Sequence, residues 1–369
     1  MKIGIYNGSG YKNWGDDAQL VNTILKLKER KYNDLVVFTR TSYIKNLTQT
    51  NIVPSSHNLF QSCTKGIQII DKFDFLVENW NCPEKLSPME RKFIKNISEL
   101  DVLFFAGSGT INTRHIRGVC IFLLPVALAK KMGKKVIISG QGIGPLTDTS
   151  YIPLIRDTLN SVDKIFIRDF NSGEKQLKEI GVTIPIIQGV DNAFGYPITT
   201  NRFQHLKDKK VVGINISFLL STKLEKILYS IASWLKEFGY TPIFNHFQNE
   251  TKIAEKCAKE FEVVTFQNAS EIAEFYSYCK MAIGMRYHST IFCLSQNVPH
   301  INLYGNTYQQ LKIKAIEDAT GLTIGIDLRG GTSREDILKK LEYNTLSFED
   351  FNKTWQNWST KKYLDIEEL

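Results

Sequence analysis

Short apolar runs alternate with longer amphipathic stretches along the whole chain. The runs in the first half are KIGIYN, LVVFT, VLFFAG, KVIISG, KIFIRD and PIIQG, and those in the second half are KVVGINI, TPIFN, EVVTF, MAIGM and PHINLY. Between them lie stretches with the apolar spacing of a helix, such as KLEKILYSIASWLKEFG and ASEIAEFYSYCK. Apolar strands separated by helices are typical of parallel sheets with right-handed crossovers. The pattern therefore predicts an α/β protein.

The alternation is interrupted once, by the polar stretch GYPITTNRFQHLKDKK of residues 195–210. We interpret this stretch as a linker between two domains, which a chain of 369 residues is long enough to form. We expect an N-terminal Rossmann-like domain over residues 1–200 and a C-terminal one over residues 201–332, facing each other across a cleft. Residues 333–369 are predicted to form a helical tail that packs back on the first domain.

The composition limits which kind of binding partner and which cell compartment we expect. The net charge of +8 favours an anionic partner, and because the basic residues are spread out, a small anion fits better than nucleic acid. The longest apolar run, CIFLLPVALA, is too short to span a bilayer and contains Pro125, so we expect a buried helix. The start of the chain has no secretory pattern, and the six cysteines form no CxxC. These features predict a cytoplasmic protein with reduced thiols and no zinc site.

Two glycine-containing segments follow predicted strands early in the chain. In YNGSGYKNWGDDAQL a helix is expected near Asp16, but a tight turn with a capped helix explains the segment as well as a ligand loop does. In FFAGSGTINTRHIRG, the run Gly107, Ser108 and Gly109 forms a candidate backbone cradle for an anion, with His115 among the nearby basic residues. The alternative for this segment is a solvated surface loop.

The other strand ends carry an amide and charged side chains. In ISGQGIGPLTD, Gln141 is a candidate ligand contact, although loop geometry alone also accounts for the segment. Arg168 follows the strand KIFI and either pairs with Asp169 or contacts a ligand. Adjacent strand residues point to opposite faces, so we favour the ligand contact.

Arg286 and His288 stand where a predicted strand gives way to a helix, in GMRYHSTIFCLSQNVP. Ligands of open α/β sheets bind outside the carboxyl ends of the strands, and a helix N-terminus attracts anions. A single histidine on a helix is often a core or surface residue, but the arginine two positions earlier favours a functional site. The segment predicts an anion site that contains a proton donor.

The order of these segments resembles the polysaccharide pyruvyl transferase family. The matching segments are NWGDDA, AGSG at 106–109, GQGIGPL at 140–146, IRD followed by Ser172, GVDNAF at 189–194, and GMRYHSTIFCLSQNVP at 284–299. The usual RLH of the family is Arg286-Tyr287-His288 here. A short DPK-like turn of the family, whose lysine helps to bind the donor, is replaced by NLYGNTYQQLKIK. The resemblance therefore leaves Lys312 or Lys314 for that role.

The resemblance implies a GT-B-like architecture and transfer of the pyruvyl group of phosphoenolpyruvate to a sugar as a cyclic ketal. The acceptor would belong to a cell-surface polysaccharide or to its lipid-linked precursor, which would place the protein in the cytoplasm or at the inner face of the membrane. Arg286 and His288 would be catalytic, with His288 protonating the methylene carbon of the donor. No metal or other cofactor is implied. The implied substrate-binding residues are Arg168, Arg286, Gly107, Ser108, Gly109, His115, Gln141, Asp16 and Lys312.

Two other functions stay open at this point. A GT-B glycosyltransferase with a nucleotide-sugar donor would share the two domains and the arginine contacts to phosphate, with Glu271 or Glu274 as candidates to hold a ribose. A non-catalytic anion-binding protein of the same fold would keep the arginines without turnover.

Overall fold

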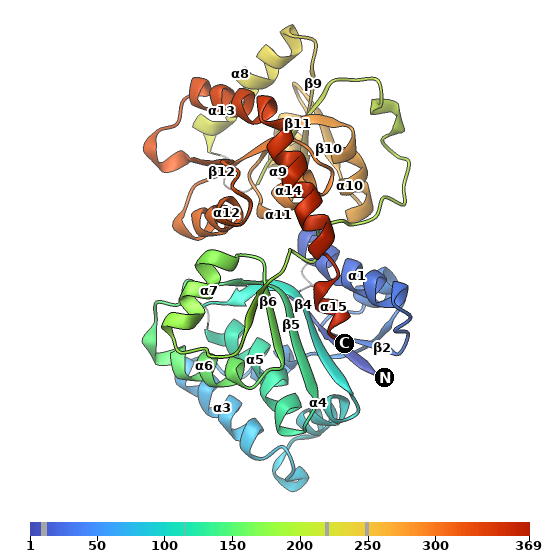
Figure 1. Ribbon diagram of the computed structural model, residues 1–369, viewed down its shortest axis with the longest axis vertical. Coiled ribbons are helices and arrows are strands. Elements are labelled where there is room, and N and C mark those ends of the chain that lie inside the picture. Colours follow the sequence, from blue (N-terminus) through green and yellow to red (C-terminus); the bar gives the residue numbers. More distant parts are fainter. Residues whose placement is uncertain (9–12, 115, 218–220, 248–250) are drawn as a thin grey trace. The chain divides into compact units, whose positions relative to one another are not determined.

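The computed structural model describes residues 1–369 except 9–12, 115, 218–220 and 248–250 (Figure 1). The chain divides into two compact units. The first unit contains Met1–Tyr11, Gln19–Asn192 and Tyr363–Leu369, and the second contains Lys12–Ala18 and Ala193–Lys362. Each unit is built on one parallel sheet with helices, which confirms the predicted α/β class.

The sheet of the first unit has the strand order β3-β2-β1-β4-β5-β6-β7, with every neighbouring pair parallel. Its strands are β1 (Ile3–Tyr6), β2 (Leu35–Thr39), β3 (Asn51–Pro54), β4 (Val102–Ile111), β5 (Lys135–Ile143), β6 (Lys164–Ile167) and β7 (Ile186–Gln188). The helices of this part of the chain are α1 (Trp14–Glu29), α2 (Tyr43–Thr48), α3 (Gly66–Glu78), α4 (Pro88–Ser98), α5 (Ile116–Lys131), α6 (Ile152–Asn160), α7 (Phe170–Glu179) and, from the C-terminal end, α15 (Leu364–Glu367). The strand order reverses between β1 and β4, the kind of position where open α/β sheets bind ligands.

The sheet of the second unit has the strand order β10-β9-β8-β11-β12-β13, again all parallel. Its strands are β8 (Val211–Asn215), β9 (Thr241–His246), β10 (Glu262–Thr265), β11 (Cys279–Gly284), β12 (His300–Tyr304) and β13 (Gly325–Asp327). Its helices are α8 (Thr222–Glu237), α9 (Thr251–Cys257), α10 (Ala269–Ser277), α11 (Tyr287–Ser295), α12 (Thr307–Thr320), α13 (Arg334–Leu346) and α14 (Phe348–Lys361). Here the order reverses between β8 and β11.

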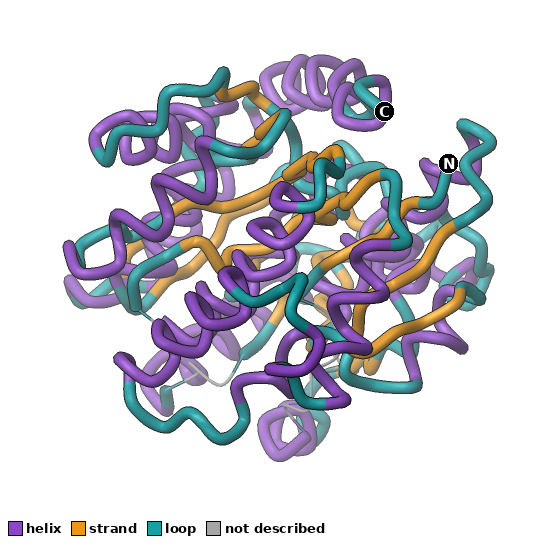
Figure 2. Tube along the Cα trace, turned by 90° about the horizontal axis from the view of Figure 1, so that it is seen from below, coloured by secondary structure: helices purple, strands orange, loops and turns teal. Residues whose placement is uncertain are grey.

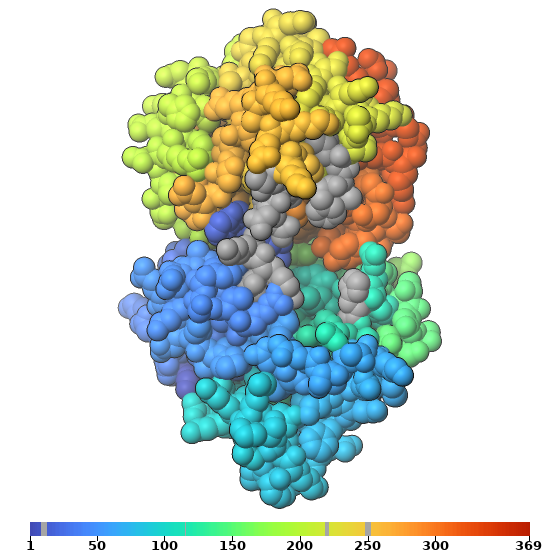
Figure 3. All heavy atoms as spheres, turned by 180° about the vertical axis from the view of Figure 1, so that it is seen from behind, coloured from blue at the N-terminus to red at the C-terminus, as the bar shows by residue number. Residues whose placement is uncertain are grey.

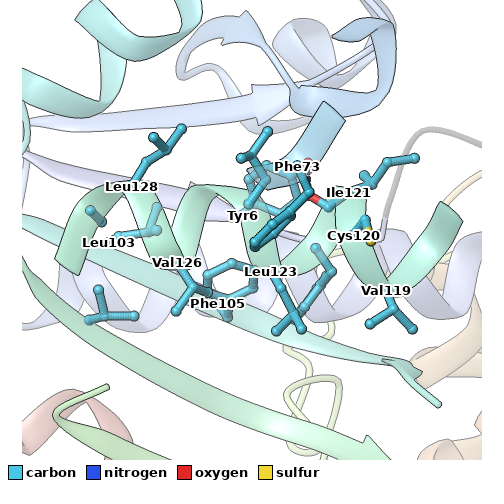
Figure 4. Packing of buried hydrophobic residues seen from close by; sticks show 14 of the residues in the cluster. Tyr6, Phe73, Leu103, Phe105, Val119, Cys120, Ile121, Leu123, Val126 and Leu128 are labelled. Atoms are coloured by element: carbon cyan, nitrogen blue, oxygen red, sulfur yellow. Dashed lines mark hydrogen bonds between the residues drawn. The ribbon is translucent and has the colours of Figure 1, made fainter. Parts of the chain in front are cut away.

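The central strands are buried along most of their length because helices flank the sheets (Figure 2). In the first unit, the predicted buried helix is α5, which packs on one face of the sheet against Tyr6, Phe73 and Phe105 (Figure 4). α3 and α4 lie on the surface of this unit, where their atoms are blue to cyan (Figure 3). Within the central strands, polar residues thus lie mainly toward the carboxyl ends, where several candidate site residues lie.

Candidate functional site

Three predicted residues of the first unit are adjacent on neighbouring strands. β4 and β5 continue pairing past their apolar segments, so Gly107, Ser108 and Gln141 lie within strands and not in loops that follow them. Ser108 pairs with Gln141, and Arg168 N donates to Gln141 O at 3.0 Å. The carboxyl-end parts of β4 and β5 and the residue after β6 therefore bring these residues side by side.

The glycines in these strands make room for side chains of the protein itself. Gly107 has a φ of +67°, and a Cβ added there would lie 2.8 Å from the side-chain amide carbon of Gln19. A Cβ at Gly142 would lie 3.0 Å from Nη2 of Arg168. The predicted backbone cradle at Gly107 is thus lined by Gln19, which follows the NWGDDA segment.

Arg168 is buried and paired. Its side chain is 5% exposed, and Nη1 donates to Oδ2 of Asp191, which is fully buried. Gln19 Nε2 donates to the same oxygen at 2.9 Å. A buried guanidinium requires such a partner, because an unpaired charge away from water is costly.

The described ion pair of Arg168 is with Asp191, while Asp169 Oδ2 accepts a hydrogen bond from Ile143 N at 2.7 Å. Sequence reasoning missed Asp191 as the partner. The signal was present in GVDNAF, because a carboxylate that follows the next strand along the sheet is well placed to reach Arg168.

The side chain of Gln141 forms hydrogen bonds with Ser108. Its side chain is fully buried, and in the amide orientation that satisfies both polar atoms, its nitrogen donates to Ser108 Oγ at 3.2 Å. Its oxygen then accepts from Ser108 N, also at 3.2 Å. The described contacts of Gln141 are therefore with the neighbouring strand.

In the second unit, Arg286 and His288 stand at the start of α11. Arg286 is the residue before the first turn, and its carbonyl accepts from Ser289 Oγ at 2.6 Å and from Asn302 Nδ2 at 3.0 Å. These bonds fix the backbone at the end of β11, so the Arg286 side chain starts from a set position. His288 follows in the first turn and is 9% exposed.

The N-terminus of α1 lies against His288. A Cβ added at Gly15 would overlap Nδ1 and Cγ of the imidazole, so only a glycine leaves room for the ring. Asn13 Oδ1 accepts from Gly15 N at 3.2 Å, and Asn13 Nδ2 donates to Asp16 Oδ2 at 2.7 Å. Asp16 is therefore one residue from the glycine that contacts His288.

Lys312 of α12 is held by two aromatic rings. Its Nζ lies 4.3 Å from the ring centroid of Tyr308 and 5.7 Å from that of Tyr287, within the range of cation–π attraction. The rings of Tyr287 and His288 are 5.1 Å apart. Lys314 is exposed. Lys312 therefore belongs with the residues at the start of α11.

The nearby thiol and phenol are kept protonated. Burial raises the pKa of Cys293 on α11 well above its usual value, with the neighbouring Cys279 as the second cause. Burial, and then the charge of Asp17, raise the pKa of Tyr196 to about 12. Neither group is suited to act as a nucleophile or a proton donor near neutral pH.

The predicted residues thus form one group in each unit. Gly107, Ser108, Gly109, Gln141 and Arg168 belong to the first unit, and Asp16, Arg286, His288 and Lys312 belong to the second. His115 lies outside the described residues. Within the described ranges, no cluster of His, Cys, Asp and Glu is arranged to hold a metal ion, and no helix is long and apolar enough to cross a bilayer.

The candidate ribose ligands of a nucleotide-sugar enzyme are engaged elsewhere. Glu274 accepts hydrogen bonds from Thr200 Oγ1 at 2.6 Å and from the backbone N atoms of Arg202 and Phe203. Glu271 pairs with Arg202. Both carboxylates are buried and hold the segment that precedes β8.

Comparison with known families decides the class of the chain. The model of the polysaccharide pyruvyl transferase family matches residues 13–307. The chain belongs to this family. It is therefore a transferase of polysaccharide modification, and the match includes all the candidate residues except Lys312.

Solved structures with the same fold include glycosyltransferases and a UDP complex of MnaA. Spinosyn forosaminyltransferase superposes with a TM-score of 0.60 at 11% identity, covering 100% of this chain and 98% of that one. Spinosyn rhamnosyltransferase complexed with thymidine diphosphate gives 0.56 at 11% identity, with 99% and 96% covered. The UDP co-structure of MnaA from S. aureus gives 0.58 at 12% identity, with 99% and 94% covered. These likenesses in fold confirm the predicted GT-B-like architecture with two Rossmann-like domains. No curated protein sequence matches the chain.

Proposed function

We propose that this family member transfers the pyruvyl group of phosphoenolpyruvate to a sugar of a cell-surface polysaccharide or of its lipid-linked precursor. The observation that carries the proposal is the family match over residues 13–307. The product would be a cyclic ketal. We place the reaction in the cytoplasm, and at the inner face of the membrane where the acceptor is lipid-linked.

The donor carries a phosphate and a carboxylate, so it requires several cations. Arg286 and Lys312, both beside the start of α11, suit its anionic oxygens, and an arginine can hold an oxyanion through two parallel hydrogen bonds. Arg168 is the further cation that we assign to the donor. Its pairing with Asp191 orients the guanidinium, whose Nη2 and Nε lie beside Gly142.

His288 is the proton donor in this proposal. Protonation of the methylene carbon turns it into a methyl group and leaves positive charge at the neighbouring carbon. A sugar hydroxyl adds to that carbon, and phosphate leaves with the bridging oxygen. A second hydroxyl then adds and closes the ring, and each hydroxyl loses its proton.

A nucleotide-sugar donor is less well supported, because Glu271 and Glu274 already bind the segment before β8. A phosphate-release assay with phosphoenolpyruvate and a panel of saccharide acceptors tests the proposal. Acceptor-dependent release of phosphate from phosphoenolpyruvate, with none of UDP from UDP-sugars, is the expected result. Transfer from a UDP-sugar alone, or no turnover with either donor, would overturn it.

A further inference from the structure

The first unit buries a carboxylate that comes from the far end of the chain. Asp365 lies on α15 in the segment Tyr363–Leu369, beyond the residues that the family model matches. Its neighbour Ile366 is 1% exposed and packs in the apolar cluster that includes Ile3 and Ile137. This packing fixes the segment on the sheet and gives the Asp365 carboxylate a set position.

Polar groups of β5 and α1 surround this carboxylate. Asp365 Oδ2 accepts a hydrogen bond from Ser139 Oγ and a longer one, of 3.5 Å, from Asn192 Nδ2. Burial raises the pKa of Asp365, and the positive charge of the buried Lys26 opposes that shift. A carboxylate is buried at low cost only where such partners exist.

Oδ2 of Asp365 sets the direction of the neighbouring hydrogen bonds, because it accepts the hydroxyl proton of Ser139. Ser139 has one hydroxyl proton. When it donates that proton to Asp365, its oxygen is left to accept from Asn192 Nδ2, at 3.0 Å. The competing bond, from Ser139 Oγ to Asn192 Oδ1 at 3.1 Å, is then not made.

Asn192 is thereby fixed in orientation. Its side-chain Nδ2 also donates to Thr23 Oγ1 at 3.0 Å. Its backbone carbonyl accepts a hydrogen bond from Asn22 Nδ2 at 2.8 Å. The side-chain Oδ1 of Asn192 lies against Gly140, which has a φ of +57°. A Cβ added at Gly140 would overlap this oxygen. The residue immediately before Asn192 is Asp191, the partner of Arg168.

We propose that Asp365 is a positioning residue for the anion site at Arg168 and acts through Ser139 and Asn192. The inference rests on the proposed function, in which Arg168 binds an anionic group of the donor. Without the carboxylate, Ser139 is free to donate to Asn192, and the amide of Asn192 is no longer fixed. Asp191 and the guanidinium of Arg168 then lose their set orientation.

The Asp365→Asn variant tests this directly, because it keeps the shape of the side chain and adds an N–H donor. With phosphoenolpyruvate as the titrant in calorimetry, we expect the Kd to rise about 3- to 30-fold. We expect kcat at saturating donor to change much less, since the reacting groups are untouched. Ser139→Ala removes the hydroxyl on β5 that links Asp365 to Asn192, and it should likewise raise the Kd. Glu367→Gln, in an exposed ion pair with Arg30 on the same segment, is the matched control and should leave the Kd unchanged.

A double-mutant cycle separates positioning from general loss of structure. In an Arg168→Gln background, Asp365→Asn should have no further effect on the Kd. An equal effect in both backgrounds, or a wild-type Kd in the single variant, would overturn the inference. If Asp365→Asn does not fold, Ser139→Ala carries the same comparison. Failure of the wild-type protein to bind phosphoenolpyruvate would instead count against the proposed function, and inorganic phosphate would then serve as the probe for the cycle.

Discussion

The imidazole of His288 lies directly against the backbone of Gly15, a residue from the opposite end of the family match. A Cβ at Gly15 would overlap the ring, so Gly15→Ala must displace His288. A displacement of about 1 Å in a reacting group costs about 10²-fold in rate. We therefore expect Gly15→Ala to lower turnover by about that factor with little change in the Kd of the donor, as measured by phosphate release and calorimetry.

Gly330→Ala is the matched control for this variant. A Cβ at Gly330 would meet nothing within 4 Å. Turnover of this control should equal that of the wild type. Full activity in Gly15→Ala would show that the position of His288 does not limit the reaction.

Replacing His288 itself should be more severe. His288→Gln removes the proposed proton donor, and loss of a general acid lowers turnover by about 10²–10⁴-fold. The donor Kd should change much less, since the arginines remain. His115→Gln is the comparison, measured at saturating donor. Loss of turnover in His115→Gln together with its retention in His288→Gln would reverse the two roles.

Arg168 and Arg286 are each predicted to bind the donor. Replacing either with Ala removes a charge-assisted contact, so donor binding should weaken by about 2–4 kcal/mol in calorimetric titration. Arg156→Ala, which removes an exposed arginine paired with Asp157, should leave the titration unchanged. Wild-type affinity in both site variants would refute the assignment.

Lys312 and Lys314 can be told apart by their surroundings. Two tyrosine rings hold the ammonium of Lys312 beside the start of α11, whereas Lys314 is exposed. We expect Lys312→Ala to raise the donor Kd by about tenfold or more, in line with the loss of one charge-assisted contact. Lys314→Ala should leave the donor Kd unchanged. The opposite ranking would move the donor contact to Lys314.

His300 should make stability depend on pH. Burial lowers its pKa from 6.5 to about 4, so between these values the unfolded chain binds a proton that the folded chain does not. The free energy of unfolding should therefore fall as pH drops from about 6.5 toward 4, by up to about 1.4 kcal/mol per pH unit from this group. Above pH 6.5 the contribution is flat. His57, with its pKa also lowered to about 4 by burial and then by Arg40, should act with the same sign.

Urea unfolding at pH 7.5 and pH 5 tests the role of His300. His300→Gln should reduce the difference between the two conditions, and the exposed His205→Gln should not. An unchanged difference in His300→Gln would assign the dependence to other groups.

The apolar pattern predicted the central strands and the edge strands β7 and β10, but not the other edge strand of each sheet. β3 and β13 were missed. β3 is half-exposed and ends at Pro54, and β13 has three residues, so neither carries the apolar run that marks a buried strand. Edge strands are recognised by pairing with a neighbour, which a local pattern does not contain.

For the site, the sequence identified strand-end residues but not their partners. Arg168 and Gln141 were predicted as ligand contacts, yet their described neighbours include Asp191 and Ser108. Likewise, the glycine at position 15 was part of a quoted segment, but its contact with His288 depends on the folded chain. Composition and spacing locate polar groups at a strand end. Which of these groups bind each other depends on the order of the strands in the sheet, and this order cannot be read from the sequence.

The place of Ile366 in the first unit has a consequence for synthesis. A ribosome makes residues 1–192 first, then residues 193–362, which belong to the second unit, and only then the segment that fills this site. Until that segment is made, the apolar surface beside Ile3 that Ile366 covers stays exposed in the nascent first unit. During the same period the Ser139 hydroxyl lacks its hydrogen bond to the Asp365 carboxylate. Because domains generally fold as they emerge, completion of the first unit has to follow synthesis of the second.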